Sequence, residues 1–161
     1  MIYGLTYLGL IHTLISLVAV AAALIGFVRD KRIDPASTLG KVYIWTTVLT
    51  CLTGFGIFQH GGFGKPHVLG ILTLLVLGLA WWADQGRFGA RSLRIATICY
   101  SLTFFFHMIP AVTETSTRLP YGAPWLPSHE APELKAITGV VFLLFLAGVV
   151  WQLRGLKAQG K

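Results

Sequence analysis

Five histidines give this 161-residue chain most of its capacity for chemistry near neutral pH. Imidazole is a ligand for haem iron, zinc and copper, and it also carries protons. Counting along the apolar runs puts His12 about 25 Å from Arg29 and His107 about 20 Å from Arg94. His60 and His67 flank a loop at the far ends of two further runs, and His129 lies in a longer loop. All five histidines are therefore predicted to lie toward the same side of the molecule.

These positions suggest a cofactor or a metal ion held by imidazoles from different helices. We expect His107 and His12 to be the ligands of one b-type haem, or of a transition metal such as zinc or copper. A metal site with more ligands would add His60 and His67 to the same pair. A structural role is the competing interpretation, because a buried histidine can simply bond to a carbonyl or a threonine.

Other polar residues accompany this candidate site. Tyr100 shares a helical face with His107, and Glu114 follows Pro110. The proline predicts a kink that widens the outer end of the bundle. We expect Glu114 to mark the point where the helix meets water. Thr50 and Thr53 lie on one face of another helix, where threonines bond across helices or to their own backbone carbonyls.

The elements that position these residues are predicted transmembrane helices. The chain is 55% hydrophobic and only 12% charged, which is about half the charged fraction of soluble domains. The apolar residues form blocks that approach the ~20 residues needed to cross a bilayer. We expect the first block to be retained rather than cleaved, because its basic cluster follows the apolar run. We predict one all-α domain over 1–161, with five spans at about 2–28, 39–59, 67–83, 93–112 and 134–153.

Basic residues set the expected orientation of this five-helix bundle. Three of the thirteen, namely Lys65, Arg118 and Lys135, fall on the side that holds the histidines. The positive-inside rule therefore places the N-terminus outside and the C-terminus in the cytoplasm, in a bacterial-type inner membrane. The net charge of +7 belongs to short loops beside the bilayer, and no basic helix or soluble domain indicates nucleic-acid binding. The other ten are Arg29, Lys31, Arg32, Lys41, Arg87, Arg91, Arg94, Arg154, Lys157 and Lys161.

Helical spacing predicts which faces are turned into the bundle. In the second span, Thr46, Thr50 and Thr53 share a face with Ile57 and His60. In the first span one face consists of small residues, against which neighbouring helices can pack closely. That face is made by Gly9, His12, Ser16, Ala19, Ala23 and Gly26.

Residues from about Tyr7 to Ala111 resemble a family of bacterial predicted membrane proteins described as a domain of unknown function. The chain departs from that family at Ser37-Thr38, where a His-Arg pair is usual, and at Phe88-Gly89-Ala90, where a more basic run is usual. The resemblance implies a compact helical bundle and no particular chemistry. The features that carry it are His12, the run Leu39-Gly40-Lys41-Val42-Tyr43, and Arg91, Arg94, Tyr100, Leu102 and Thr103.

Histidines on several helices of a small bundle also resemble the cytochrome b561 group of haem proteins. Those proteins place haems toward both faces of the membrane, whereas the half of this chain near the basic loops has no histidine. The resemblance therefore implies at most one haem, near the outer face.

Three function classes follow from these observations. The leading hypothesis is a small redox or metal-binding membrane protein. The second is a non-catalytic subunit or assembly factor, which would bind a larger membrane complex or a second copy through its small-residue faces. The third is an oligomeric transporter or channel for ions or small solutes, although no inverted repeat is visible.

Overall fold

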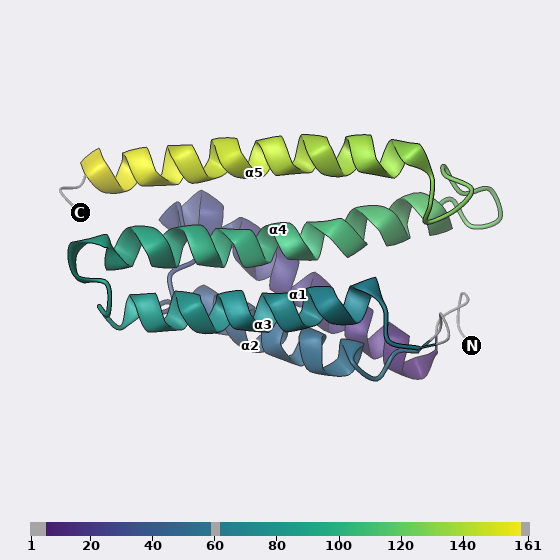
Figure 1. The fold of residues 1–161 in the computed structure, drawn as a ribbon, viewed down its shortest axis with the longest axis horizontal. Helices are drawn as coiled ribbons and strands as arrows, with labels where there is room; N and C mark the ends of the chain where they lie inside the picture. The colour runs from purple at the N-terminus through teal and green to yellow at the C-terminus, as the bar shows by residue number, and fades with distance from the viewer. Residues whose placement is uncertain (1–5, 59–61, 159–161) are drawn as a thin grey trace.

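The computed structural model describes residues 6–58 and 62–158, which form five α-helices and no strand (Figure 1). A short 3₁₀ turn, η1 (Gly89–Arg91), leads into the fourth helix. The predicted all-α bundle is confirmed for this part of the chain. The helices are α1 (Tyr7–Asp30), α2 (Thr38–Gly54), α3 (Lys65–Asp84), α4 (Ser92–Arg118) and α5 (Pro132–Ala158).

Four of these helices, α1, α3, α4 and α5, are long and apolar enough to cross a membrane. The remaining helix, α2, has 17 residues and ends at Gly54, about five residues before the predicted end of the second span. Conversely, α4 continues through Pro110 to Arg118 and α5 reaches Ala158. Helix α4 thus extends about six residues beyond the predicted span, and Pro110 lies inside it.

The helices run alternately up and down, so α1 begins at one end of the bundle and α5 finishes at the other (Figure 1). We call the end where α1, α3 and α5 finish the basic end. It carries nine of the ten clustered basic residues, and the tenth, Lys161, lies outside the described residues. The opposite end, which holds Lys65, Arg118 and Lys135, we call the histidine end.

Small residues allow α1 to pack closely against α2. The buried residues of α1 are all alanine or glycine, and they include Gly9, Ala19, Ala23 and Gly26, as the spacing predicts. Helix α3 packs mainly on α4 and also touches α2, which joins the two pairs into one bundle. A core of apolar and aromatic side chains, centred on Tyr43 and Tyr100, fills the space between them.

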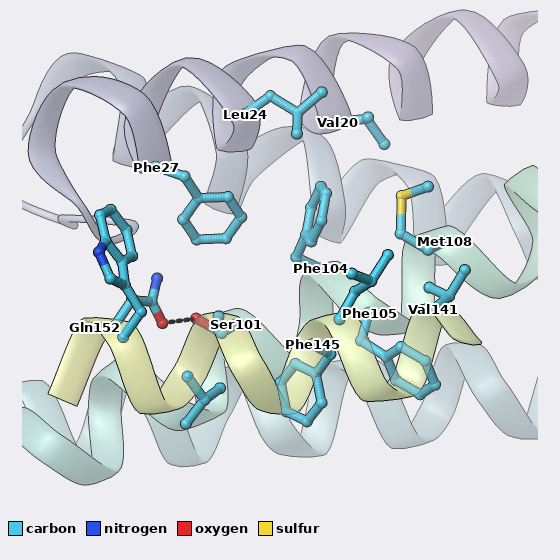
Figure 2. A pocket seen from close by; sticks show the side chains of 14 residues that line it. Val20, Leu24, Phe27, Ser101, Phe104, Phe105, Met108, Val141, Phe145 and Gln152 are labelled. Atoms are coloured by element: carbon cyan, nitrogen blue, oxygen red, sulfur yellow. Dashed lines mark hydrogen bonds between the residues drawn. The ribbon is translucent and has the colours of Figure 1, made fainter. Parts of the chain in front are cut away.

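Helix α5 is peripheral, since within the described residues it packs on α4 alone. An apolar groove of about 400 Å³ is left between α1 and α5, with α4 as its floor. Figure 2 shows the aromatic and aliphatic side chains that line it. At one end of the groove, Ser101 of α4 donates a hydrogen bond of 2.8 Å to Oε1 of Gln152 on α5.

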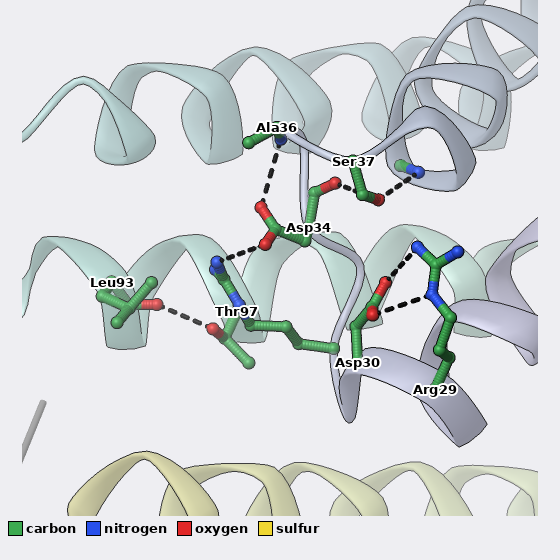
Figure 3. Close-up of polar contacts among 9 residues, drawn as sticks. Arg29, Asp30, Asp34, Ala36, Ser37, Leu93 and Thr97 are labelled. Atoms are coloured by element: carbon green, nitrogen blue, oxygen red, sulfur yellow. Dashed lines mark hydrogen bonds and ion pairs between the residues drawn. The ribbon is translucent and has the colours of Figure 1, made fainter. Parts of the chain in front are cut away.

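The loop between α1 and α2 is a compact turn at the basic end (Figure 3). Arg32 forms an ion pair of 3.0 Å with Asp34, and Asp34 also accepts a hydrogen bond from the backbone N–H of Ala36. The Ser37 hydroxyl donates to the Asp34 carbonyl at 2.8 Å and accepts from the Gly40 N–H at 3.0 Å. Ser37 is therefore the N-cap of α2.

Replacing Ser37 by alanine should lower the stability of the bundle by about 1 kcal/mol, because the first turn of α2 loses its side-chain acceptor. Thermal unfolding of detergent-solubilised protein measures the loss. The neighbouring change Thr38→Ala is the control, since Thr38 is exposed and lies just inside the helix. Equal melting temperatures for the two variants would contradict the assigned cap.

Candidate functional site

A buried chain of hydrogen bonds joins α2 to α4 in the middle of the bundle. Nε2 of His107 lies 3.0 Å from the Thr47 hydroxyl, and the Tyr43 hydroxyl lies 2.8 Å from that of Thr103. Thr103 donates its own proton to the Tyr100 carbonyl, so Tyr43 must donate to Thr103. Tyr43, Thr47 and Thr103 are completely buried and His107 is only 7% exposed.

His107 belongs to this chain through its ring as well as through Nε2. The Tyr43 and His107 rings meet edge to face, with centroids 6.1 Å apart. Within the described part of the chain no backbone acceptor is recorded for the Thr47 hydroxyl, so either the hydroxyl or the imidazole can be the donor in their hydrogen bond. In the form where His107 donates from Nε2, its Nδ1 carries the free lone pair.

His12 of α1 makes the equivalent contact with α2 about 9 Å further along that helix, six residues on. Its Nδ1 lies 3.1 Å from the Thr53 hydroxyl. Thr53 donates its proton to the carbonyl of Leu49 or Thr50 on its own helix, so it accepts from Nδ1–H of His12. The lone pair of a neutral His12 is therefore on Nε2.

Gly54 makes room for this imidazole. A Cβ at position 54 would lie 3.2 Å from Cε1 of His12, tighter than an ordinary side-chain contact. His12 of α1 and His107 of α4 thus both hydrogen-bond to threonines of α2.

The other predicted metal ligands are placed differently. His67 is 5% exposed and stacks on Phe58 and Phe63, with centroids 5.0 and 5.1 Å away. Its Nδ1 accepts from the Gly64 N–H, which caps the start of α3. His60 lies outside the described residues.

Near the C-terminal end of α4, Glu114 forms an ion pair with Arg118 and lies 3.4 Å from Nε2 of His129. Glu114 is therefore held within a surface cluster of charged and polar groups. This is consistent with the expected position at the end of the apolar segment, although the helix itself continues for one more turn.

Tyr100 and Thr50 do not contact the two histidines through their hydroxyls. The Tyr100 hydroxyl is buried, and within the described residues no hydrogen-bond partner is recorded for it. The Thr50 hydroxyl donates to the Thr46 carbonyl of its own helix, which is the local alternative expected for threonines in membrane helices.

Residue-by-residue reading of the sequence missed Tyr43, Thr47 and Thr103 as members of this site. The sequence predicts that Thr46, Thr50 and Thr53 share a face of α2, whereas the buried residues of this helix include Tyr43, Thr47 and Thr50. The threonines alone could not fix the phase, since Thr46, Thr50 and Thr53 also follow helical spacing. The signal that was available is the large Tyr43 at the same spacing, four residues before Thr47.

Within the described ranges, no three or more histidine, cysteine, aspartate or glutamate side chains are grouped as a metal-binding cluster. Cys51 and Cys99 are both free and buried. Comparison with family models, curated proteins and solved structures finds no match to this chain. The chemistry of the site therefore has to be argued from His12, His107 and their threonine partners alone.

Proposed function

We propose that the protein is a small membrane metal-binding protein in which His12 and His107 hold one transition-metal ion for redox or metal chemistry. One observation supports the proposal most directly. Each imidazole has one ring nitrogen fixed by a threonine hydroxyl of α2, at 3.1 Å for His12 and 3.0 Å for His107. Metal-ligating histidines usually have their second ring nitrogen bonded in this way, which orients the ring.

The placement of the two imidazoles adds to this argument. Ionisable side chains inside membrane helices are rare and are generally retained for function, because they are unfavourable in hydrocarbon. Here two of them come from helices far apart in sequence, with 94 positions between residues 12 and 107. Neither ring needs to move away from its threonine to offer its other nitrogen to an ion.

A small ion fits this arrangement better than a b-type haem does. Thr47 already engages Nε2 of His107, so the nitrogen left for a ligand is Nδ1. Nδ1 is bonded directly to the carbon that joins the ring to Cβ, so it lies close to the backbone of α4. A flat macrocycle would meet that helix, whereas zinc and copper are bound through either nitrogen of a neutral imidazole.

We also propose that the basic end faces the cytoplasm of a bacterial-type cell, which puts the metal site in the outer half of the inner membrane. The opposite locations of the basic and histidine ends support this orientation through the positive-inside rule. It requires α2 to span together with the four longer helices. Its 17 residues give a length of about 26 Å.

The proposal predicts about one bound copper or zinc ion per chain in protein purified in mild detergent. His12→Ala and His107→Gln should each remove this ion, because two ligands are the whole of the proposed coordination by side chains. Thr53→Val should weaken binding by roughly 10- to 100-fold, as is usual when the group that orients a ligand is lost. Elemental analysis and titration with Cu(I) or Zn²⁺ measure both effects.

His129→Ala is the matched control, because His129 lies in the loop next to Glu114 and should leave the metal content unchanged. An absorption spectrum of the same sample separates the two kinds of centre. If the protein has a Soret band that both His12→Ala and His107→Gln abolish, the two histidines bind a haem and not a single metal ion. If folded protein contains no stoichiometric metal and shows no Soret band, both the metal-ion and the haem hypotheses are refuted.

A further inference from the structure

The groove between α1 and α5 contains one polar group that the protein does not use. Gln152 is only 6% exposed, and Ser101 donates to its Oε1. This hydrogen bond fixes which side of the amide carries the NH₂ group. Figure 2 shows that nitrogen on the side away from Ser101, toward Phe27.

Among the described residues, no acceptor is recorded for the two protons of this amide. The amide nitrogen is not one of the completely enclosed atoms that lack a partner in the described residues, so it is accessible from outside the protein. A polar donor in an apolar setting is unfavourable unless it is paired. The Gln152 NH₂ group can therefore donate a hydrogen bond to an acceptor oxygen of a molecule bound in the groove. The side chains around it, such as Phe104, Phe145 and Leu144, are apolar and offer none.

A cation lies beside the same end of the groove. The ammonium group of Lys31 is 5.8 Å from the centroid of the Trp151 ring, and Trp151 lines the groove next to Gln152. Lys31 is exposed, and within the described residues no ion pair is recorded for it, whereas neighbouring Arg29 is paired with Asp30. Both polar features are at the basic end, where anionic groups are favoured.

We propose that the groove is a binding site for one phospholipid with a net anionic headgroup. An acyl chain lies between α1 and α5, an ester carbonyl accepts from the Gln152 amide, and the phosphate is paired with Lys31. The depth fits this assignment, because Gln152 is two residues before Arg154 and thus about 3 Å from the level of a basic side chain. The volume of about 400 Å³ is in the range of small-ligand sites.

Selectivity in such a site must come from the polar groups. Surrounding lipid is as apolar as the groove lining, so the acyl chain alone gives no preference for one lipid over another. The amide would favour any molecule with a carbonyl, and Lys31 adds the preference for an anion. A neutral isoprenoid quinone would satisfy the amide without using the lysine, so it is the rival occupant.

Native mass spectrometry of the full chain tests the proposal, with phosphatidylglycerol and phosphatidylcholine of identical acyl chains. We expect one tightly retained phosphatidylglycerol and about fivefold weaker retention of phosphatidylcholine. Lys31→Gln should reduce retention of phosphatidylglycerol about fivefold and leave phosphatidylcholine unchanged. Gln152→Leu should weaken both lipids.

Gly148 offers a direct way to fill the groove. It lines the groove, and a Cβ there meets nothing within 4 Å, so Gly148→Phe should be accommodated by the fold and should abolish retention. Gly139→Phe on the same helix is the control, because Gly139 also faces open space but does not line the groove. Its retention should equal that of the unmodified protein.

Three results would overturn the assignment. Unchanged retention of phosphatidylglycerol in folded Gly148→Phe would show that the lipid binds elsewhere. Equal retention of the two phospholipids would exclude an anionic phospholipid as the occupant. So would displacement of both phospholipids by a neutral quinone that binds the Lys31→Gln variant as well as it binds the unmodified protein. These measurements do not depend on the metal content of the protein.

Discussion

Gly40→Ala should destabilise the bundle at or beyond the ~3 kcal/mol upper end of typical overpacking effects. A Cβ at position 40 would lie 1.8 Å from the carbonyl oxygen of Asp34 and 2.4 Å from its carbon. Both are backbone atoms, so no side-chain rotation relieves the clash. The turn between α1 and α2 would have to move as a whole, and the Ser37 hydrogen bonds to Asp34 and Gly40 would be lost with it.

Thermal unfolding in detergent measures this effect, and Gly78→Ala provides the matched control. Gly78 lies within α3, where a Cβ meets nothing within 4 Å. The same substitution should therefore leave stability unchanged or raise it by up to about 1 kcal/mol, because alanine favours the helix over glycine. If both variants melt at the same temperature, the close approach of α2 to the Asp34 carbonyl is wrong.

Tyr43→Ala should be comparably destabilising, by about 3–5 kcal/mol, which is the usual range for truncating a large buried aromatic side chain. Tyr43 is completely buried in the main core and donates a hydrogen bond to Thr103. Its ring also contacts His107 edge to face. The substitution would thus open a cavity beside the proposed ligand as well as weaken the core.

Two further variants separate these contributions. Tyr43→Phe keeps the ring and removes only the hydrogen bond to Thr103, so it should lower stability by about 1 kcal/mol. Trp45→Ala is the control for truncation on the same helix, since Trp45 is 68% exposed. A loss for Trp45→Ala as large as that for Tyr43→Ala would contradict the burial of Tyr43.

The sequence predicts the helical class and the general positions of the five helices well, because apolar blocks dominate the composition. Helix ends were less predictable. Apolar residues continue after Gly54, so hydropathy does not show where α2 stops. The helix α4 continues beyond Pro110 to Arg118, because an internal proline removes one backbone hydrogen bond and can still be tolerated within a long helix.

Some residues of the candidate site could likewise be predicted from the sequence and others could not. His12 and His107 were predictable from residue type and depth, since few ionisable residues occur in the apolar runs. Their partners were not, because a threonine can bond to its own helix or to a neighbour with equal ease. Thr50 and Thr53 have the same side chain and lie three residues apart, yet the Thr50 hydroxyl bonds to the Thr46 carbonyl of its own helix whereas the Thr53 hydroxyl also contacts His12.

The unequal lengths of the helices have a consequence for the surrounding membrane. At 17 residues, α2 is about 26 Å long, some 4 Å less than a typical hydrocarbon layer. At 27 residues, α5 reaches about 40 Å. With α2 spanning as proposed, the bilayer would thin beside α2 while α5 tilts, and such hydrophobic mismatch makes a protein sensitive to membrane thickness. Short-chain lipids should accommodate the α2 side of the bundle more readily than long-chain lipids.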